Sequence, residues 1–256
     1  MIPLRDQATA VRALVESADP AAVWAVGGPE GPHAGSDGGH PADAAFDVDG
    51  LGAVLALWPA VGSLVDEGAL RLHTPLAAYG DPAAEGTPAG TTAHHLLTHP
   101  GGTTHLTHLT RLVEHLSGSP LADLVATRVW HPLGMTGTGC TDGTLRAPLA
   151  DLARFLCHLL APGDPAAPTG ISHTWTTESL RIRTGELTPA RGLLWDPAPH
   201  GVWTHHAPKD DGPTLWISPR HHRWAVLLPT AGQGMSRTAF REAAFASTAA
   251  ERAMVV

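Results

Sequence analysis

One stretch, residues 46–68, constrains the fold more than any other part of the chain. Its apolar side chains recur with a period of about 3.6 residues, which is the stripe of a helix packed into a core. They are Leu51, Val54, Leu55, Trp58, Val61, Leu64 and Val65. Asp49 can cap the first free N–H groups, and Gly68 suits the end of the helix. Pro59 cannot donate to the Leu55 carbonyl and is expected to kink the helix.

Composition excludes several classes of protein. The net charge is −8 and the basic residues are scattered, so no nucleic-acid partner is expected. The chain has no run of about 18 apolar residues, and no membrane span is predicted. Residues 1–7 lack a basic region followed by an apolar one, so the sequence predicts a cytoplasmic protein without a secretory signal. Cys140 and Cys157 alone do not suggest a disulfide framework.

The rest of the chain alternates between helical and strand-like segments. Residues 7–17 and 236–252 read as terminal helices, and residues 148–160 as another helix that begins at a proline. Residues 21–28 and 33–39 read as a strand and its return strand. Three further strands are expected at 201–206, 214–218 and 223–230.

Several motifs carry a family resemblance by their order and spacing. They are the helix frame opened by Phe46 and closed by residues 64–70, and the segments 92–102, 128–138 and 148–160. Together they resemble the serine β-lactamase and penicillin-binding-protein superfamily, especially the class C β-lactamases and related esterases. The resemblance implies an α/β (α+β) β-lactamase/transpeptidase-like fold, with an antiparallel sheet flanked by helices and a reduced helical subdomain. The whole chain, 1–256, would be one such domain, with a sheet part at about 1–48 and 190–256 and a helical part at about 49–189.

The catalytic motifs of that family are missing at the matching positions. Acyl-serine chemistry needs a nucleophilic serine and a nearby base. By the resemblance, the serine falls on Gly50 and the lysine of Ser-x-x-Lys falls on Ala53. Lys209 is the only lysine in the chain, so no Ser-x-x-Lys motif exists anywhere. Ser63 lies about three turns further along the predicted helix and is a poor substitute.

The second and third motifs of the family also differ here. The chain contains no asparagine, so the Tyr-x-Asn motif cannot exist, and His105 and His108 are the nearest polar groups. Either histidine could act as a general base near neutral pH, or could simply face solvent. The family's Lys-Thr-Gly or His-Thr-Gly motif should fall within 204–212, where His206 or Lys209 could occupy its first position. Neither residue is followed by Thr-Gly, and Lys209 could equally belong to a flexible loop.

The sequence therefore predicts a β-lactamase-like protein that lacks the serine nucleophile and base and acts on a small molecule. We expect non-covalent chemistry such as cyclisation, isomerisation or dehydration. A non-enzymatic ligand-binding or scaffold protein, or a residual serine-independent hydrolase, are the alternatives. The predicted pocket consists of Asp47, Asp49, Gly50, Ala53, His105, His108, Trp203, His205, His206, Lys209 and Asp211. No cofactor is expected, and the histidine spacing does not match a metal motif.

Overall fold

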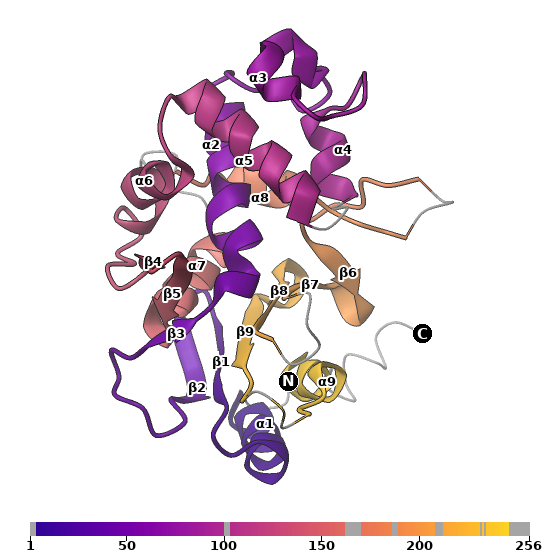
Figure 1. Ribbon diagram of the computed structural model, residues 1–256. Coiled ribbons are helices and arrows are strands. Elements are labelled where there is room, and N and C mark those ends of the chain that lie inside the picture. Colours follow the sequence, from indigo (N-terminus) through magenta and orange to yellow (C-terminus); the bar gives the residue numbers. More distant parts are fainter. Residues whose placement is uncertain are drawn as a thin grey trace. The chain divides into compact units, whose positions relative to one another are not determined.

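The computed structural model describes residues 4–99, 103–161, 170–185, 189–207, 212–230, 232 and 234–245. The chain forms two compact units (Figure 1). The first, called here the sheet unit, comprises residues 1–50, 146–161 and 198–256. The second, called the helical unit, comprises residues 51–145 and 162–197. The sequence-based division placed 146–161 in the helical part and 190–197 in the sheet part, whereas the structure groups these segments the other way. Segment 146–161 belongs to the sheet unit because its helix packs against the sheet.

An antiparallel sheet of six strands, in the order β2-β1-β9-β8-β7-β6, organises the sheet unit. The strands are β1 (Val23–Gly28), β2 (Gly31–Ser36), β6 (Asp196–Ala198), β7 (Val202–His206), β8 (Thr214–Ser218) and β9 (Arg223–Leu228). Short 3₁₀ turns, η5 (Pro199–Gly201) and η6 (Pro219–His221), connect some of them. Strand β6 crosses the boundary between the units. The predicted N-terminal hairpin and the three C-terminal strands are therefore confirmed.

Helices cover both faces of the sheet because its central strands are apolar on both sides. Helices α1 (Leu4–Ala18) and α9 (Arg237–Phe245) pack on each other, and Phe240 contacts Trp24 and Trp216 across one face. Helix α7 (Leu149–Leu160) packs on β1, β2 and β9. Ala25, which alternates with Trp24 along β1, lines a hollow together with Ala153 of α7, so α7 lies on the opposite face.

Two smaller elements lead the chain into and out of the sheet unit. Strand β3 (Ala45–Asp47) pairs antiparallel with β5 (Thr144–Pro148), and Asp47 lies opposite Arg146. Strand β4 (Gly139–Thr141) precedes β5 in the chain and lies next to it in the same small sheet.

The helical unit is built around the central helix, which the apolar stripe of residues 51–65 predicts. Its other elements are η3 (Leu76–Tyr79), α3 (Asp81–Ala84), α4 (Ala93–Thr98), α5 (Thr103–Ser117), α6 (Leu121–Val125), the π-helix η4 (Ala126–Trp130) and α8 (His173–Ser179). Helices α5 and α6 both pack on the central helix and on each other. No helix in the described ranges is long and apolar enough to cross a membrane.

The central helix is not a single α-helix as the sequence predicts. It begins as a 3₁₀ turn, η1 (Asp49–Leu51), continues as a π-helix, η2 (Ala53–Leu57), and becomes α-helical only in α2 (Trp58–Asp66). Pro59 explains the change, because it lacks an N–H and is tolerated only in the first turn of an α-helix. The buried indole of Trp130 donates from Nε1 to the Leu55 carbonyl at 2.9 Å, which replaces the missing backbone donor.

Candidate functional site

Gly50, where the resemblance would place the nucleophile, is closed by packing inside the sheet unit. Gly50 has no left-handed φ, so its backbone would accept a side chain. A Cβ built on Gly50 would overlap the Cβ of Ala207, with the Ala207 Cα at 3.1 Å and the Pro213 Cγ at 3.7 Å. Glycine at this position therefore allows the start of the central helix to lie directly against the end of β7. A serine hydroxyl has no room there unless Ala207 moves.

Ala207, which the sequence did not single out, is held in place by its backbone. Its N–H donates to the Pro213 carbonyl at 3.0 Å. Its carbonyl lies 2.8 Å from His206 Nδ1 and 3.4 Å from Arg237 Nη2. The same Nη2 donates to the Gly212 carbonyl at 3.0 Å. Arg237, from the start of α9, thus joins the two described ends of the segment between β7 and β8.

These bonds also fix how His206 can act. Its Nδ1 lies 2.8 Å from the Ala207 carbonyl, a distance that favours an Nδ1–H donor. In that tautomer Nε2 is the unprotonated nitrogen and can accept a proton. Arg237 Nη1 lies 3.3 Å from the same Nδ1 and cannot donate to it in this tautomer. Because the ring is exposed, its Nε2 is a candidate general base at the surface of the sheet unit.

The two acidic candidates lie at the entry to the central helix. Asp47 is the last residue of β3, and its Oδ1 accepts the backbone N–H of Asp49 at 3.0 Å. Both residues are exposed. Asp47 Oδ1 therefore accepts one of the free N–H groups at this helix start. Asp49 precedes Gly50 in the chain, and Gly50 itself lies against Ala207.

The remaining predicted residues are divided between the two units. Trp203 and His205 lie on β7, opposite Ile217 and Leu215. Ala53, His105 and His108 belong to the helical unit, on η2 and α5. His105 Nδ1 lies 2.6 Å from the His99 carbonyl, and His108 packs near Gly86. Lys209 and Asp211 lie outside the described residues.

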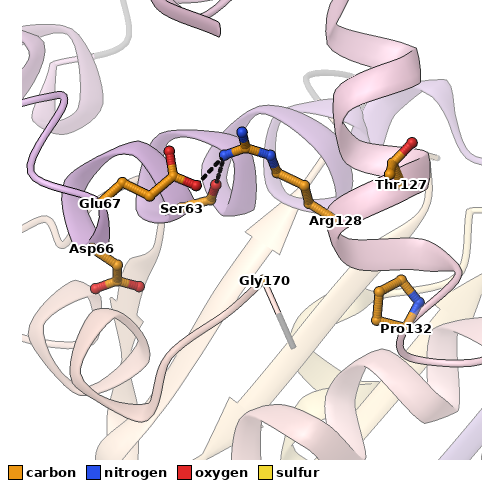
Figure 2. A pocket seen from close by; sticks show the side chains of 7 residues that line it. All are labelled: Ser63, Asp66, Glu67, Thr127, Arg128, Pro132 and Gly170. Carbon is orange, nitrogen blue, oxygen red and sulfur yellow. Dashed lines mark hydrogen bonds and ion pairs between the residues drawn. The ribbon is translucent and has the colours of Figure 1, made fainter. Parts of the chain in front are cut away.

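The helical unit contains a polar hollow of about 490 Å³ that the sequence analysis did not predict (Figure 2). Residues from the end of α2, from η4 and from the segment before α8 line it: Ser63, Asp66, Glu67, Thr127, Arg128, Pro132 and Gly170. Arg128 Nη1 donates to Ser63 Oγ at 2.8 Å and also bonds the Glu67 carboxylate. Gly170 donates its N–H to the Arg128 carbonyl at 2.9 Å, and a Cβ on Gly170 would overlap that carbonyl oxygen.

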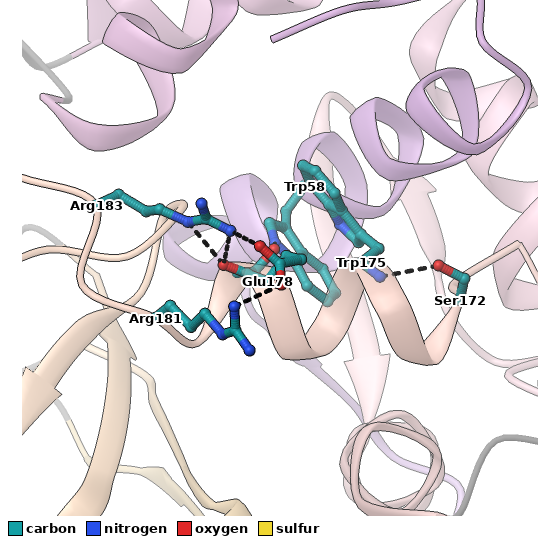
Figure 3. Close-up of polar contacts among 7 residues, drawn as sticks. Trp58, Ser172, Trp175, Glu178, Arg181 and Arg183 are labelled. Atoms are coloured by element: carbon teal, nitrogen blue, oxygen red, sulfur yellow. Dashed lines mark hydrogen bonds and ion pairs between the residues drawn. The ribbon is translucent and has the colours of Figure 1, made fainter.

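Helix α8 packs against the central helix, and Figure 3 shows Ser172 at the start of α8 and Trp58 beside Trp175. Ser172 caps α8 by accepting the Trp175 N–H at 2.9 Å, and its hydroxyl lies 3.1 Å from Asp66 Oδ1. Trp58 donates from its indole to Ser179 Oγ at 2.9 Å, and its ring packs on Trp175. No local pattern predicts this arrangement, since 170–185 and 63–67 are far apart in the chain.

A second hollow, of about 630 Å³, lies in the sheet unit between β2, α7 and Phe46. Small side chains such as Ala25, Ala34 and Ala153 dominate its wall. None of the predicted pocket residues lines either hollow. Among the described residues, no group of three histidine, cysteine or acidic side chains is arranged to hold a metal ion.

Four histidines of the helical unit form a cluster with a consequence for stability. The rings of His73 and His94 lie 4.5 Å apart, and His94 also contacts His95. Burial, the largest cause, and the nearby charges of His73, His95, Arg183 and His99 together lower the pKa of His94 to about 4. The folded chain thus favours neutral His94, whereas an unfolded chain protonates it below about pH 6.5.

Stability should therefore fall as the pH drops from about 6.5 to 4, because the unfolded state binds more protons in that window. Solvent screening limits the effect of this partly exposed group to about 1 kcal/mol, or roughly 2–4 °C in Tm. His94→Gln should flatten the pH profile of Tm, while His131→Gln, at an exposed position, should leave it unchanged. Parallel profiles for wild type and His94→Gln would contradict this prediction.

Comparison with known proteins supports the fold. No family model matches the sequence. No curated protein matches it. Solved structures do match: a β-lactamase from Mycobacterium bovis has a TM-score of 0.66 at 21% identity, over 92% of this chain and 100% of that chain. The D-alanine carboxypeptidase AmpC from Burkholderia cenocepacia has a TM-score of 0.69 at 18% identity, over 94% of this chain and 97% of that chain. EstCE1, a hydrolase with promiscuous acyltransferase activity, has a TM-score of 0.76 at 12% identity, over 96% of this chain and 100% of that chain.

Proposed function

We propose that this chain, which has the fold of the serine β-lactamases and penicillin-binding proteins, acts on a small molecule without an acyl-serine intermediate. The observation that carries the proposal is the contact of Gly50 with Ala207. An acyl-serine enzyme needs a nucleophile, a base and free N–H donors that face the developing oxyanion. Gly50 and Ala53 supply no nucleophile or base, and the Ala207 N–H next to Gly50 is engaged by Pro213.

The chemistry that we propose instead is proton transfer, as in cyclisation, isomerisation or dehydration. His206 supports it, since it precedes Ala207 in the chain and its Nδ1 contact with the Ala207 carbonyl leaves Nε2 as an acceptor. Such a positioned base contributes about 10²–10⁴-fold to a rate. Asp49, the residue before Gly50 in the chain, offers a carboxylate. A ligand-binding protein without turnover is the second candidate. It is favoured by Arg237, whose Nη2 bonds to the Ala207 and Gly212 carbonyls hold both described ends of the β7–β8 segment in place.

The absence of acylation is tested by incubating the wild-type protein with a fluorescent penicillin and with a fluorophosphonate. We expect no mass increase in intact-protein mass spectrometry, because no serine of the sheet unit can occupy the Gly50 position. A stoichiometric adduct on any serine would overturn the proposal.

The role of His206 is tested with fractions of small metabolites from a cell extract, followed for both product formation and thermal stabilisation. His206→Ala should reduce turnover about 10²–10⁴-fold while Tm stays the same. His33→Ala, at another exposed position of the sheet unit, is the matched control. Ligand-induced stabilisation without any product would favour the binding protein. Turnover that His206→Ala leaves intact would remove His206 from the mechanism.

A further inference from the structure

We propose that the polar hollow of the helical unit binds a small aliphatic zwitterion, with a carboxylate on Arg128 and a primary ammonium on Asp66. The site is separate from the Gly50 position and does not depend on the function proposed above. Its size, about 490 Å³, lies within the usual range for small-ligand pockets. Figure 2 shows Asp66 and Arg128 on different sides of the hollow, with Gly170 between them.

Arg128 is oriented before any ligand arrives. Its side chain is 35% exposed, and the partners that hold it are the buried Ser63 hydroxyl and the Glu67 carboxylate. Within the described part of the chain, both of these bonds come from Nη1. The guanidinium has five N–H donors in a planar fork, so Nη2 and Nε remain for a ligand. That edge matches a carboxylate with two parallel hydrogen bonds.

Asp66 lies in surroundings that favour a cation. It ends α2, where the negative end of the helix dipole opposes a carboxylate. Glu67, the next residue, forms an ion pair with Arg128. Among the described residues, Asp66 has no basic partner and accepts one hydrogen bond, from the Ser172 hydroxyl. Burial raises the pKa of Asp66, the Ser172 hydroxyl opposes that rise, and the Glu67 charge adds to it. An ammonium bound at Asp66 would offset both unfavourable effects.

The charge balance of the lining selects a zwitterion over a simple ion. Two carboxylates and one guanidinium line the hollow, so a lone anion would meet Asp66 and Glu67, and a lone cation would meet Arg128. A zwitterion can place its carboxylate on Arg128 and its ammonium on Asp66, so each charge meets one of opposite sign. Gly170 lies directly against the Arg128 backbone, where a Cβ would overlap the carbonyl oxygen, so no side chain from this position enters the hollow.

The test uses the full-length protein and three probes of equal length: 5-aminopentanoate, pentylamine and pentanoate. Isothermal titration and NMR titration measure their affinities. We expect 5-aminopentanoate to bind at least about tenfold more tightly than either single-charge probe, since each charge–charge hydrogen bond contributes roughly 1.5–3 kcal/mol. If pentylamine bound as tightly as 5-aminopentanoate, Arg128 would have no role in binding and the proposal would be wrong. No binding of the zwitterion at tens of millimolar would overturn the proposal.

Two substitutions assign the charges. Asp66→Asn keeps the shape and the Ser172 hydrogen bond. It should weaken 5-aminopentanoate about tenfold without weakening pentanoate, which no longer meets the Asp66 charge. Arg128→Lys keeps the charge but loses the fork, and it should weaken the zwitterion without affecting pentylamine. The control is Arg111→Lys, which changes another ion-paired arginine of the helical unit that does not line the hollow. Circular dichroism establishes that each variant is folded. Unchanged affinity in folded Asp66→Asn would refute the site.

Discussion

Gly50→Ala is expected to destabilise the protein by about 1–3 kcal/mol, the usual cost of adding a methyl group to a well-packed contact. The reason is steric, since the new Cβ would overlap the Ala207 Cβ while the Gly50 backbone itself accepts an L-residue. Arg237 and Pro213 hold Ala207, so the strand end cannot retreat without losing hydrogen bonds. Denaturant unfolding followed by circular dichroism measures the change.

Gly52→Ala is the matched control, two residues along the same chain segment. A Cβ on Gly52 would lie 3.9 Å from Leu145 Cδ2, which is ordinary van der Waals contact. Gly52 has helical φ and ψ of −54° and −33°. Its replacement should therefore be neutral or stabilise the protein by about 0.5–1 kcal/mol, because alanine loses less backbone entropy than glycine. Equal losses at both positions would contradict the steric account.

The same contact predicts that the family's chemistry cannot be restored by two substitutions. Gly50→Ser combined with Ala53→Lys should be destabilised like Gly50→Ala and should not hydrolyse nitrocefin or a p-nitrophenyl ester at a useful rate. Catalytic groups that act as a unit are strongly non-additive, and the proton shuttle and strand motif would still be missing. Efficient turnover by the double variant would show that Ala207 moves aside easily.

Trp130→Phe is expected to cost about 2–4 kcal/mol of unfolding free energy. Part of that cost is lost ring volume in a side chain that is 2% exposed. The larger part comes from the Leu55 carbonyl, which is buried, has no backbone N–H partner at Pro59, and loses the Trp130 Nε1–H. Thermal and denaturant unfolding should both report the loss.

A double-mutant cycle separates the two contributions. In Pro59→Ala the new backbone N–H can donate to the Leu55 carbonyl, so the carbonyl no longer depends on Trp130. Trp130→Phe should then cost about 1 kcal/mol less in the Pro59→Ala background than in the wild type. Additive effects would show that Trp130 stabilises the helix through packing alone.

Local patterns in the sequence were enough for the framework of the fold. The apolar period of residues 51–65 predicted the central helix, and alternation with turn residues predicted β1, β2, β7, β8 and β9. Such patterns suffice because helices and strands bury one face or both with a fixed period. The motif order pointed to the β-lactamase-like fold, which the solved structures share. The single lysine and the missing asparagine showed, without a structure, which catalytic motifs cannot exist.

Contacts between distant residues were decided only by the tertiary structure. Pro59 predicted a disturbed helix, but nothing local indicates that Trp130, 71 positions further along, supplies the donor that the Leu55 carbonyl lacks. Gly50 and Ala207 are likewise far apart in the chain, and their overlap depends on where β7 ends. Ser63, Asp66 and Arg128 form a hollow because a helix end meets a π-helix. Periodicity fixes which face of an element is buried, whereas the partners it meets depend on packing of the whole unit.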